Sequence, residues 1–402
     1  MIRHLLKLTW NRKRANALIV VEMFFSFLVV FGVLTAAVTG WQRWNQPLGF
    51  DWRNVLQVDM ELGHRGRDAE KELHAPVMRM LDELRALPQV ESAALSLTPP
   101  YGGAQASSAY EVNGRSVPYT FDDVSDGYAD VMRIRLVKGR WFTREDDAST
   151  HQPVVVDTNA ARALFGDADP IGRKMDEEPP PGWKEKWHGL HVIGVVEPFR
   201  KGGETAAPDT MVFRRYAANG EYGILGRSLM VRVHPGTPGA FEETVIKRLQ
   251  QVAPGVTFTI SPLPQTRAQS LRLAVAPIAA AAIVGLFLIA MVALGLTGVL
   301  WQNVTRRTRE LALRRAVGAP GAAVHRQVLA EVILLASFAL VAGAIVILQL
   351  PILGAFSVVT PSAFTTGFAA AVATIYLLTV LCGLYPSWLA SRLEPADALR
   401  YE

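Results

Sequence analysis

Long apolar segments without charge constrain this 402-residue chain more than any other feature. Residues 15–38 carry one charge, Glu22; residues 273–305 carry none, and neither do residues 332–391. A helix needs about 20 apolar residues to cross the hydrocarbon layer of a bilayer, and the last segment is too long for one crossing. Proline and glycine residues near 351–361 divide it. The sequence therefore predicts four transmembrane helices, near residues 15–38, 273–305, 327–350 and 363–389.

The basic residues predict the orientation of these helices. Five Lys or Arg residues precede the first span and six Arg residues lie in the segment 302–326, whereas the turn at 351–362 has none. Because basic loops stay in the cytoplasm, we expect both termini and the segment 302–326 on that side and residues 41–270 outside. A cleaved signal peptide is the alternative for the N-terminus. Its usual apolar run of about 7 to 15 residues is shorter than this one, and no clear cleavage site follows.

The large outer region, residues 41–270, is close to neutral. Between residues 42 and 270 there are 27 basic and 30 acidic residues, so the excess of positive charge, +5 for the chain, belongs to the ends. This distribution excludes a basic nucleic-acid-binding face on the one segment large enough to form a folded domain. The single cysteine, Cys382, lies in the last apolar segment, so the outer region must fold without disulfides.

The outer region begins and ends with the same order of elements, a strand, a helix and a strand. The expected elements cover residues 54–60, 68–87 and 90–97 at its start, and 228–234, 239–252 and 256–260 at its end. Short alternating apolar runs between them, such as 153–156 and 191–196, predict an inserted lobe. The expected fold class is an α-helical membrane protein with four transmembrane helices and a large extracytoplasmic α+β domain, built of two β-α-β-like units and an inserted mainly β lobe.

No combination of residues predicts a catalytic, cofactor or metal site. His188 and His191 lack the helical spacing and the cysteine partners of a zinc site, and the acidic run 145–147 is more typical of solvated loop charges than of a cation site. The sequence has neither a nucleophile elbow nor a phosphate-binding loop. We therefore expect a non-catalytic membrane subunit without a cofactor.

Two carboxylates, Glu22 and Glu331, fall inside predicted spans, and each lies near the cytoplasmic end. They are explained either by contact with the membrane interface and nearby Arg residues, or by an interhelical pair that responds to movement on the cytoplasmic side. Ion-coupled transporters place ionisable groups near the middle of the bilayer. No such path follows from these two residues, so passage of a substrate through the four helices is not expected.

The cytoplasmic segment 304–318 predicts a short charged helix. Arg306, Glu310 and Arg314 are four residues apart, which places opposite charges along one face. Gly318 suits the end of a helix, with a proline shortly beyond it. Such a helix can rest on anionic lipid, or it can act as a rigid lever that contacts a cytoplasmic protein.

Several motifs resemble those of a known family. Residues Arg309-Glu-Leu-Ala-Leu-Arg-Arg-Ala-Val-Gly-Ala319 and the segment 385–400 resemble the FtsX-like permease domains of ABC systems. Three outer segments, 137–146, 161–172 and 192–196, resemble the periplasmic core domain of MacB-type permeases. The resemblance implies a basic N-terminus and first span in 1–40, a core domain in 41–270, and an FtsX-like permease domain in 271–402 with three transmembrane helices and a coupling helix at 304–318.

The resemblance also implies partners and a mechanism. Two permease chains, identical or related, assemble with two ATPase chains, and ATP-driven movement passes through the membrane helices to the outer domains, a process called mechanotransmission. Unlike in MacB, no ATPase fused to this chain is expected, so the resemblance implies a separate cytoplasmic one. Membrane lipid and a periplasmic adaptor protein are further implied partners, and nucleic acid is not. The ATPase-coupling role would fall on Arg306, Arg307, Glu310, Arg314, Arg315 and Gly318.

The expected function is that of a permease subunit in the cytoplasmic (inner) membrane, which exports or extracts a substrate by mechanotransmission. The alternative is a signalling or scaffold permease that controls an outer partner such as a wall hydrolase. Whether a purified complex redistributes any substrate distinguishes the two. The sequence does not indicate which substrate is moved.

Overall fold

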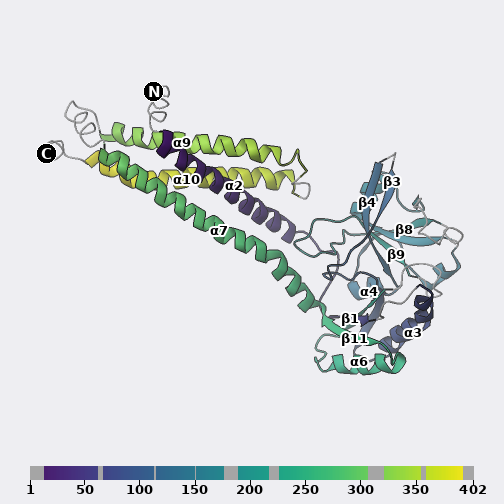
Figure 1. Ribbon diagram of the computed structural model, residues 1–402. Coiled ribbons are helices and arrows are strands. Elements are labelled where there is room, and N and C mark those ends of the chain that lie inside the picture. Colours follow the sequence, from purple (N-terminus) through teal and green to yellow (C-terminus); the bar gives the residue numbers. More distant parts are fainter. Residues whose placement is uncertain are drawn as a thin grey trace. The chain divides into compact units, whose positions relative to one another are not determined.

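The computed structural model describes residues 13–61, 67–112, 115–149, 151–175, 189–216, 226–306, 321–354 and 359–392. The chain divides into two compact units. We call Met1–Gln42 with Ala274–Glu402 the membrane unit, and Arg43–Leu273 the outer unit. Figure 1 labels the long helices of the membrane unit and several elements of the outer unit.

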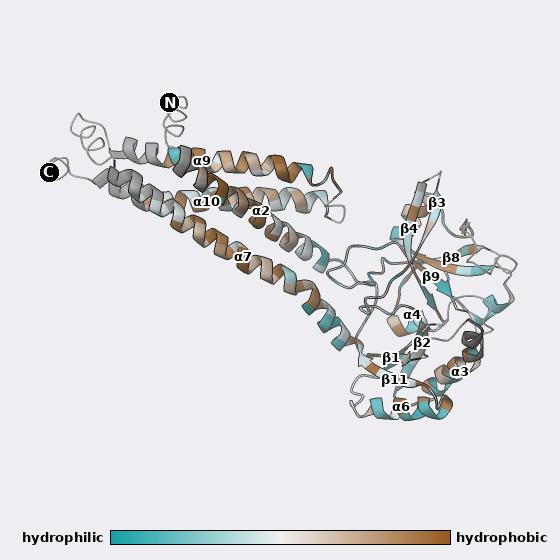
Figure 2. Ribbon diagram, in the orientation of Figure 1, coloured by the Kyte–Doolittle hydropathy of each residue, from teal (hydrophilic) through white to brown (hydrophobic). Residues whose placement is uncertain are grey.

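In its described residues, the membrane unit has four long helices, α2 (Lys13–Trp44), α7 (Leu263–Arg306), α9 (Gly321–Gln349) and α10 (Pro361–Arg392). Each contains a segment long and apolar enough to cross a membrane: Ile19–Trp44, Leu263–Gly295, Leu329–Gln349 and Pro361–Leu384. Figure 2 shows the hydrophobic residues that run along these helices. The four predicted transmembrane helices are thereby confirmed. Both α2 and α7 are longer than their apolar runs, and their outer ends belong to the outer unit.

Helix α2 contacts each of the other three helices of the membrane unit. The Phe31 ring packs edge-on against Phe364 of α10, with ring centroids 5.4 Å apart. Gly343 of α9 lies directly against the Phe27 ring, and Gly285 of α7 faces Val29 and Val33. A glycine at a contact lets two backbones approach, which is how helices associate in lipid, where apolar burial gives little driving force.

The outer unit is an α+β domain around one mixed sheet, in the order β11-β1-β10-β2-β4-β9-β6-β8-β5, with β3 paired to β4 and β7 paired to β8. The strands are β1 (Val55–Glu61), β2 (Val90–Ser96), β3 (Ala106–Val112), β4 (Arg115–Val124), β5 (Leu136–Gly139), β6 (Gln152–Asp157), β7 (Lys174–Met175), β8 (Leu190–Val196), β9 (Met211–Arg215), β10 (Ser228–Val233) and β11 (Thr257–Pro262). The helices are α3 (Arg67–Arg85), α4 (Tyr128–Met132), the 3₁₀ helix η1 (Arg144–Ala148), α5 (Thr158–Phe165) and α6 (Phe241–Val252).

The two predicted β-α-β units are confirmed, and they interleave. Strand β1 lies between β11 and β10, and β10 lies between β1 and β2, with every pair antiparallel. Each unit is therefore a split β-α-β, whose two strands are separated by a strand of the other unit. Helices α3 and α6 pack together in one apolar core with these strands; Val77, Leu81, Val245 and Leu249 are fully buried there. Because their strands interleave, the two β-α-β units share one four-stranded sheet, β11-β1-β10-β2, which we call the frame with its helices α3 and α6.

The inserted lobe is mainly β, as predicted. It leaves the frame after Ser96 and returns at Ser228, and these two residues are paired in register. Within it, β4 runs parallel to β9, and β6 runs parallel to β8. One apolar core lies between the lobe sheet and α5. A second contains Phe50, Phe199 and the first residue of α7, Leu263, which is fully buried.

Candidate functional site

Most of the predicted ATPase-coupling residues lie outside the described residues. Arg306 is the last residue of α7, and nothing is described of its side chain. Arg307, Glu310, Arg314, Arg315 and Gly318 fall in the gap between α7 and α9. Their coupling role stays a prediction.

The two predicted intramembrane carboxylates are on different helices. Glu22 is on α2, and its carboxylate lies against Gly295 of α7: a Cβ atom added to that glycine would be 3.0 Å from Glu22 Oε2. Glu331 is half-buried on α9. Glu22 therefore belongs to the contact between α2 and α7.

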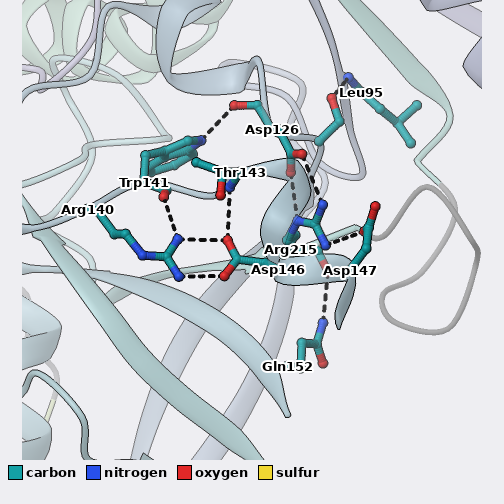
Figure 3. A network of polar contacts seen from close by, with 10 residues as sticks. Leu95, Asp126, Arg140, Trp141, Thr143, Asp146, Asp147, Gln152 and Arg215 are labelled. Atoms are coloured by element: carbon teal, nitrogen blue, oxygen red, sulfur yellow. Dashed lines mark hydrogen bonds and ion pairs between the residues drawn. The ribbon is translucent and has the colours of Figure 1, made fainter. Parts of the chain in front are cut away.

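Two residues of the acidic run at 145–147 are ion-paired and not simply solvated, which corrects the expectation from sequence for Asp146 and Asp147, while Glu145 is exposed. Asp146 is only 4% exposed. It accepts two hydrogen bonds from the Arg140 guanidinium, at 2.8 and 2.5 Å, and one from the Thr143 N–H at 2.9 Å (Figure 3). Asp146 thus caps η1 through the Thr143 N–H and pairs with Arg140. These hydrogen bonds replace water at its buried carboxylate. Among the described residues no three His, Cys, Asp or Glu side chains form a potential metal site.

The same network extends to the buried Arg215 of β9 (Figure 3). Its guanidinium binds Asp126 through Nε at 2.7 Å and Asp147 through Nη1 at 2.7 Å, and the Trp141 indole N–H donates to the Asp126 carbonyl at 2.9 Å. Burial of a charge is tolerated when its hydrogen bonds are satisfied in this way. The segment 137–146 therefore contributes to the folding of the lobe.

His191, one of the two histidines considered for metal binding, stacks on His151 with ring centroids 3.9 Å apart. Its expected companion, His188, lies outside the described residues.

The arrangement best suited to a function lies where α2 enters and α7 leaves the outer unit. Residues 198–206, between β8 and β9, form what we call the junction loop. Arg200, 2% exposed, donates from Nη1 to the carbonyl of Arg43, in the last turn of α2, at 2.7 Å and to that of Gln46 at 3.3 Å. From Nη2 it donates to two carbonyls of its own loop, those of Glu204 at 2.8 Å and Ala206 at 3.0 Å.

The junction loop also binds α7. Arg267, in the first turns of that helix, donates from Nε to Glu204 Oε1 at 2.6 Å. The Tyr101 hydroxyl donates to Glu204 Oε2 at 3.3 Å. Burial, and then the charge of Glu204, raise the pKa of Tyr101, so the phenol stays protonated and remains a donor. One loop thus holds the ends of both helices.

Sequence reasoning missed the junction loop. Its charged residues occur in a run with two glycines, Phe199-Arg-Lys-Gly-Gly203, which is typical of an exposed turn. The partners of Arg200 and Arg267 are 157 and 63 residues away. No spacing rule connects such distant positions.

Two family models cover most of the chain. The MacB-like periplasmic core domain matches residues 28–252, and the FtsX-like permease C-terminal domain matches residues 282–395. Together they span both units.

Individual proteins show the same similarity. The macrolide export ATP-binding/permease protein MacB of Bordetella avium is 28% identical over 363 residues, which cover 84% of this chain and 50% of that protein. The uncharacterized ABC transporter permease YvrN of Bacillus subtilis is 27% identical over 321 residues, 74% of each chain. The chain therefore spans about half the length of that MacB relative and about three quarters of YvrN.

Two solved structures are similar to the chain at low scores. The periplasmic region of MacB from Actinobacillus actinomycetemcomitans has a TM-score of 0.38 at 18% identity, over 56% of this chain and 94% of that one. The extracellular domain of the transporter YknZ has a TM-score of 0.36 at 16% identity, over 52% of this chain and all of that one. The core-domain model alone covers more than half of the chain. This is thus a membrane protein with a large extracytoplasmic domain, and it belongs to the family of ABC transporter permeases that join a MacB-like periplasmic core domain to an FtsX-like permease domain.

Proposed function

We propose that the chain is the permease subunit of an ABC complex in the cytoplasmic membrane, with both termini in the cytoplasm. It couples ATP hydrolysis by a separate ATPase to movement of its outer unit, and this movement exports or extracts a substrate outside the membrane. A second permease chain completes the complex, and a periplasmic adaptor is a further proposed partner. The relatives named as macrolide exporters support export, without indicating which substrate this chain moves.

One observation carries this proposal. Helix α7 is 44 residues long, begins in the core of the outer unit at the fully buried Leu263, and ends at Arg306, where the charged cytoplasmic segment starts. A helix rises about 1.5 Å per residue, and α7 continues as one helix through its internal proline, Pro277. A displacement at its cytoplasmic end therefore has a continuous path into the outer unit.

The polar groups of the membrane unit also support movement over passage. Within the described spans, the hydroxyls of Thr374 and Thr379 donate to carbonyls four residues earlier in their own helix. Hydroxyls that are satisfied within their own helix contribute little to a polar path. The substrate is therefore proposed to be handled by the outer unit.

A pulldown of the full chain from detergent tests the proposal, because it should recover an ATPase chain. Charge reversal at Arg314 and Arg315 should then release the ATPase or leave its hydrolysis without effect on the outer unit, since the docking helix would repel its partner. The matched control reverses two exposed cations of the outer unit, Arg162 and Lys247. Full coupling after reversal at Arg314 and Arg315 would contradict the docking role.

A further inference from the structure

We propose that the junction loop, residues 198–206, makes the outer unit follow its two membrane helices, with Arg200 as the positioning residue. This inference rests on the proposed function, because it assigns residues to the transfer of movement. It is supported in four steps: the contacts of the loop with α2, its contacts with α7, its anchorage in the sheet, and the tight fit of its backbone.

The first step is the set of hydrogen bonds between the loop and the end of α2. The last carbonyls of a helix have no partner within it and carry the negative end of the helix dipole. The Arg200 guanidinium donates to one of them, at Arg43, and to Gln46 just beyond the helix. The contact is reciprocal, since Arg43 Nη1 donates to the Thr205 carbonyl at 2.9 Å. Two cations therefore bind the end of α2 to the loop in both directions.

The second step is the ion pair between the loop and α7. The ion pair between Glu204 and Arg267 is mostly shielded from water, with the side chains 7% and 21% exposed. The Arg267 guanidinium also lies over the Trp52 ring, 4.5 Å from its centroid, an attractive cation–π contact. Glu204 is only four residues from Arg200. The residues that contact the two helices are thus close together in one short loop.

The third step is the anchorage of the loop in the sheet. The Phe199 N–H donates to Asp157 Oδ2, at the end of β6, at 3.2 Å, and the Phe199 ring packs edge-on against Phe213 of β9. The Lys201 carbonyl accepts a hydrogen bond from the Tyr101 N–H, in the segment that follows β2, at 3.1 Å. A force on the loop is therefore received by β6, β9 and the segment after β2.

The fourth step is the fit of the loop backbone. Gly203 has φ +84°, and a Cβ atom there would overlap the Tyr101 ring. Gly49, which precedes Phe50, has φ +80°, and a Cβ there would overlap the carbonyl of Pro198. Glycine is the residue that allows both the positive φ and the close approach. A loop packed this closely cannot shift without losing these contacts, so it transmits displacement.

The test uses the full chain in complex with the ATPase that it recovers. Cys382→Ser removes the native thiol, and Val137→Cys, on the exposed edge strand β5, carries an environment-sensitive fluorophore. Strand β5 pairs with β8, the strand that leads into the junction loop. The measured quantity is the ATP-dependent fluorescence change divided by the rate of ATP hydrolysis.

We expect Arg200→Ala to lower this ratio by about fivefold or more, the lower end of coupling between protein sites, while ATP hydrolysis continues. Arg200→Lys should restore part of it, because an ammonium keeps the charge but not the planar arrangement of donors. Glu204→Gln and Arg267→Gln should each lower the ratio less. These two mild substitutions decide the question if Arg200→Ala does not fold.

Arg232→Ala is the matched control. Arg232 is 1% exposed and donates to the carbonyls of Val131, Arg53 and Asp51 at 2.6 to 2.8 Å, without a described hydrogen bond to α2, α7 or the junction loop. It should weaken the fold and keep the ratio. The inference is overturned if Glu204→Gln and the Arg200 variants keep the full ratio, or if Arg232→Ala lowers it as much as Arg200→Ala. A wild-type chain that recovers no ATPase overturns the proposed function itself, and the inference with it.

Discussion

Different kinds of internal contact stabilise the outer unit and the membrane unit. In the outer unit, Arg200, Arg214, Arg215 and Arg232 are each less than 8% exposed, and each donates to carbonyls or carboxylates. In the described part of the membrane unit, helices meet where a side chain is missing, as at Gly343 and Gly367. The outer unit therefore depends on a few buried charges, and the bundle depends on small residues.

This difference follows from the two solvents. A buried guanidinium in a water-exposed domain can connect segments far apart in sequence, because its five donors satisfy several acceptors at once. In lipid an unpaired charge is far more costly, and close backbone approach is the main source of attraction. Removing the partner of a buried charge in the outer unit should therefore lower its stability, and so should adding a side chain at a glycine contact in the membrane unit.

The largest effect is expected for a broken buried ion pair in the outer unit. Arg214 Nε lies 2.6 Å from Asp123 Oδ1, and the side chains are 8% and 0% exposed. Asp123→Asn leaves the buried guanidinium without its counter-charge and should lower the free energy of unfolding by about 3–5 kcal/mol. Chemical unfolding followed by tryptophan fluorescence measures this. Glu243→Gln, which breaks an exposed pair with Lys247, is the control and should leave the midpoint unchanged.

The next effect is a pH dependence of the outer unit. Burial raises the pKa of Asp122 to about 7, against the opposing charge of Lys201 and the Ser96 hydroxyl. The folded state then binds the proton more tightly than the unfolded state. Stability from this group is fully present below about pH 4 and falls as pH rises to about 7, by at most about 1.4 kcal/mol per pH unit. Asp122→Asn should reduce the slope of the unfolding midpoint across this range, and the rest of the slope should remain because burial also raises the pKa of Asp157 to about 7. An identical pH profile in both proteins would contradict the assignment.

A smaller effect is expected for an added side chain in the membrane unit. At Gly367 of α10, a Cβ atom would overlap Thr35 of α2, so Gly367→Val should force the helices apart at a cost of about 1–3 kcal/mol. Gly32→Val on α2 is the control, since nothing lies within 4 Å of its added Cβ. The folded fraction after heating in detergent compares them. Equal losses for both would show that helix propensity, and not packing, determines the effect.

The smallest effect is expected for hydroxyls of the bundle. The Thr379 hydroxyl donates to the Ile375 carbonyl at 2.7 Å, and Thr379→Val should cost no more than about 0.6 kcal/mol, a typical value for polar contacts in membrane bundles. The buried Thr35 hydroxyl has no hydrogen-bond partner among the described residues, so Thr35→Val should be neutral or stabilising. The same heating assay checks the opposite signs. A larger loss for Thr35→Val would contradict the comparison.

Local pattern was enough to predict most elements and not enough to predict how they meet. Hydropathy located the four spans, because lipid requires a long continuous apolar helix. Alternation and helical periodicity located both β-α-β units. The interleaving of β1 and β10 and the hydrogen bonds from Arg200 to the end of α2 depend on distant partners, so no window of sequence contains them. The acidic run 145–147 was misread partly for this reason, because Asp147 pairs with Arg215, 68 residues away. The partner of Asp146, Arg140, is only six residues away.

The in-register pair Ser96 and Ser228 has a consequence for engineering and for divergence. A short turn joining these two residues would excise everything between them and still leave an antiparallel hairpin, so the four-stranded frame could close on itself. Such a minimal chain would keep the helices α2 and α7 and lose the junction loop, residues 198–206. Shortening the insert would thus leave the frame joined to α2 and α7 through the chain alone, without the hydrogen bonds and the ion pair that Arg200 and Glu204 make to the ends of these helices.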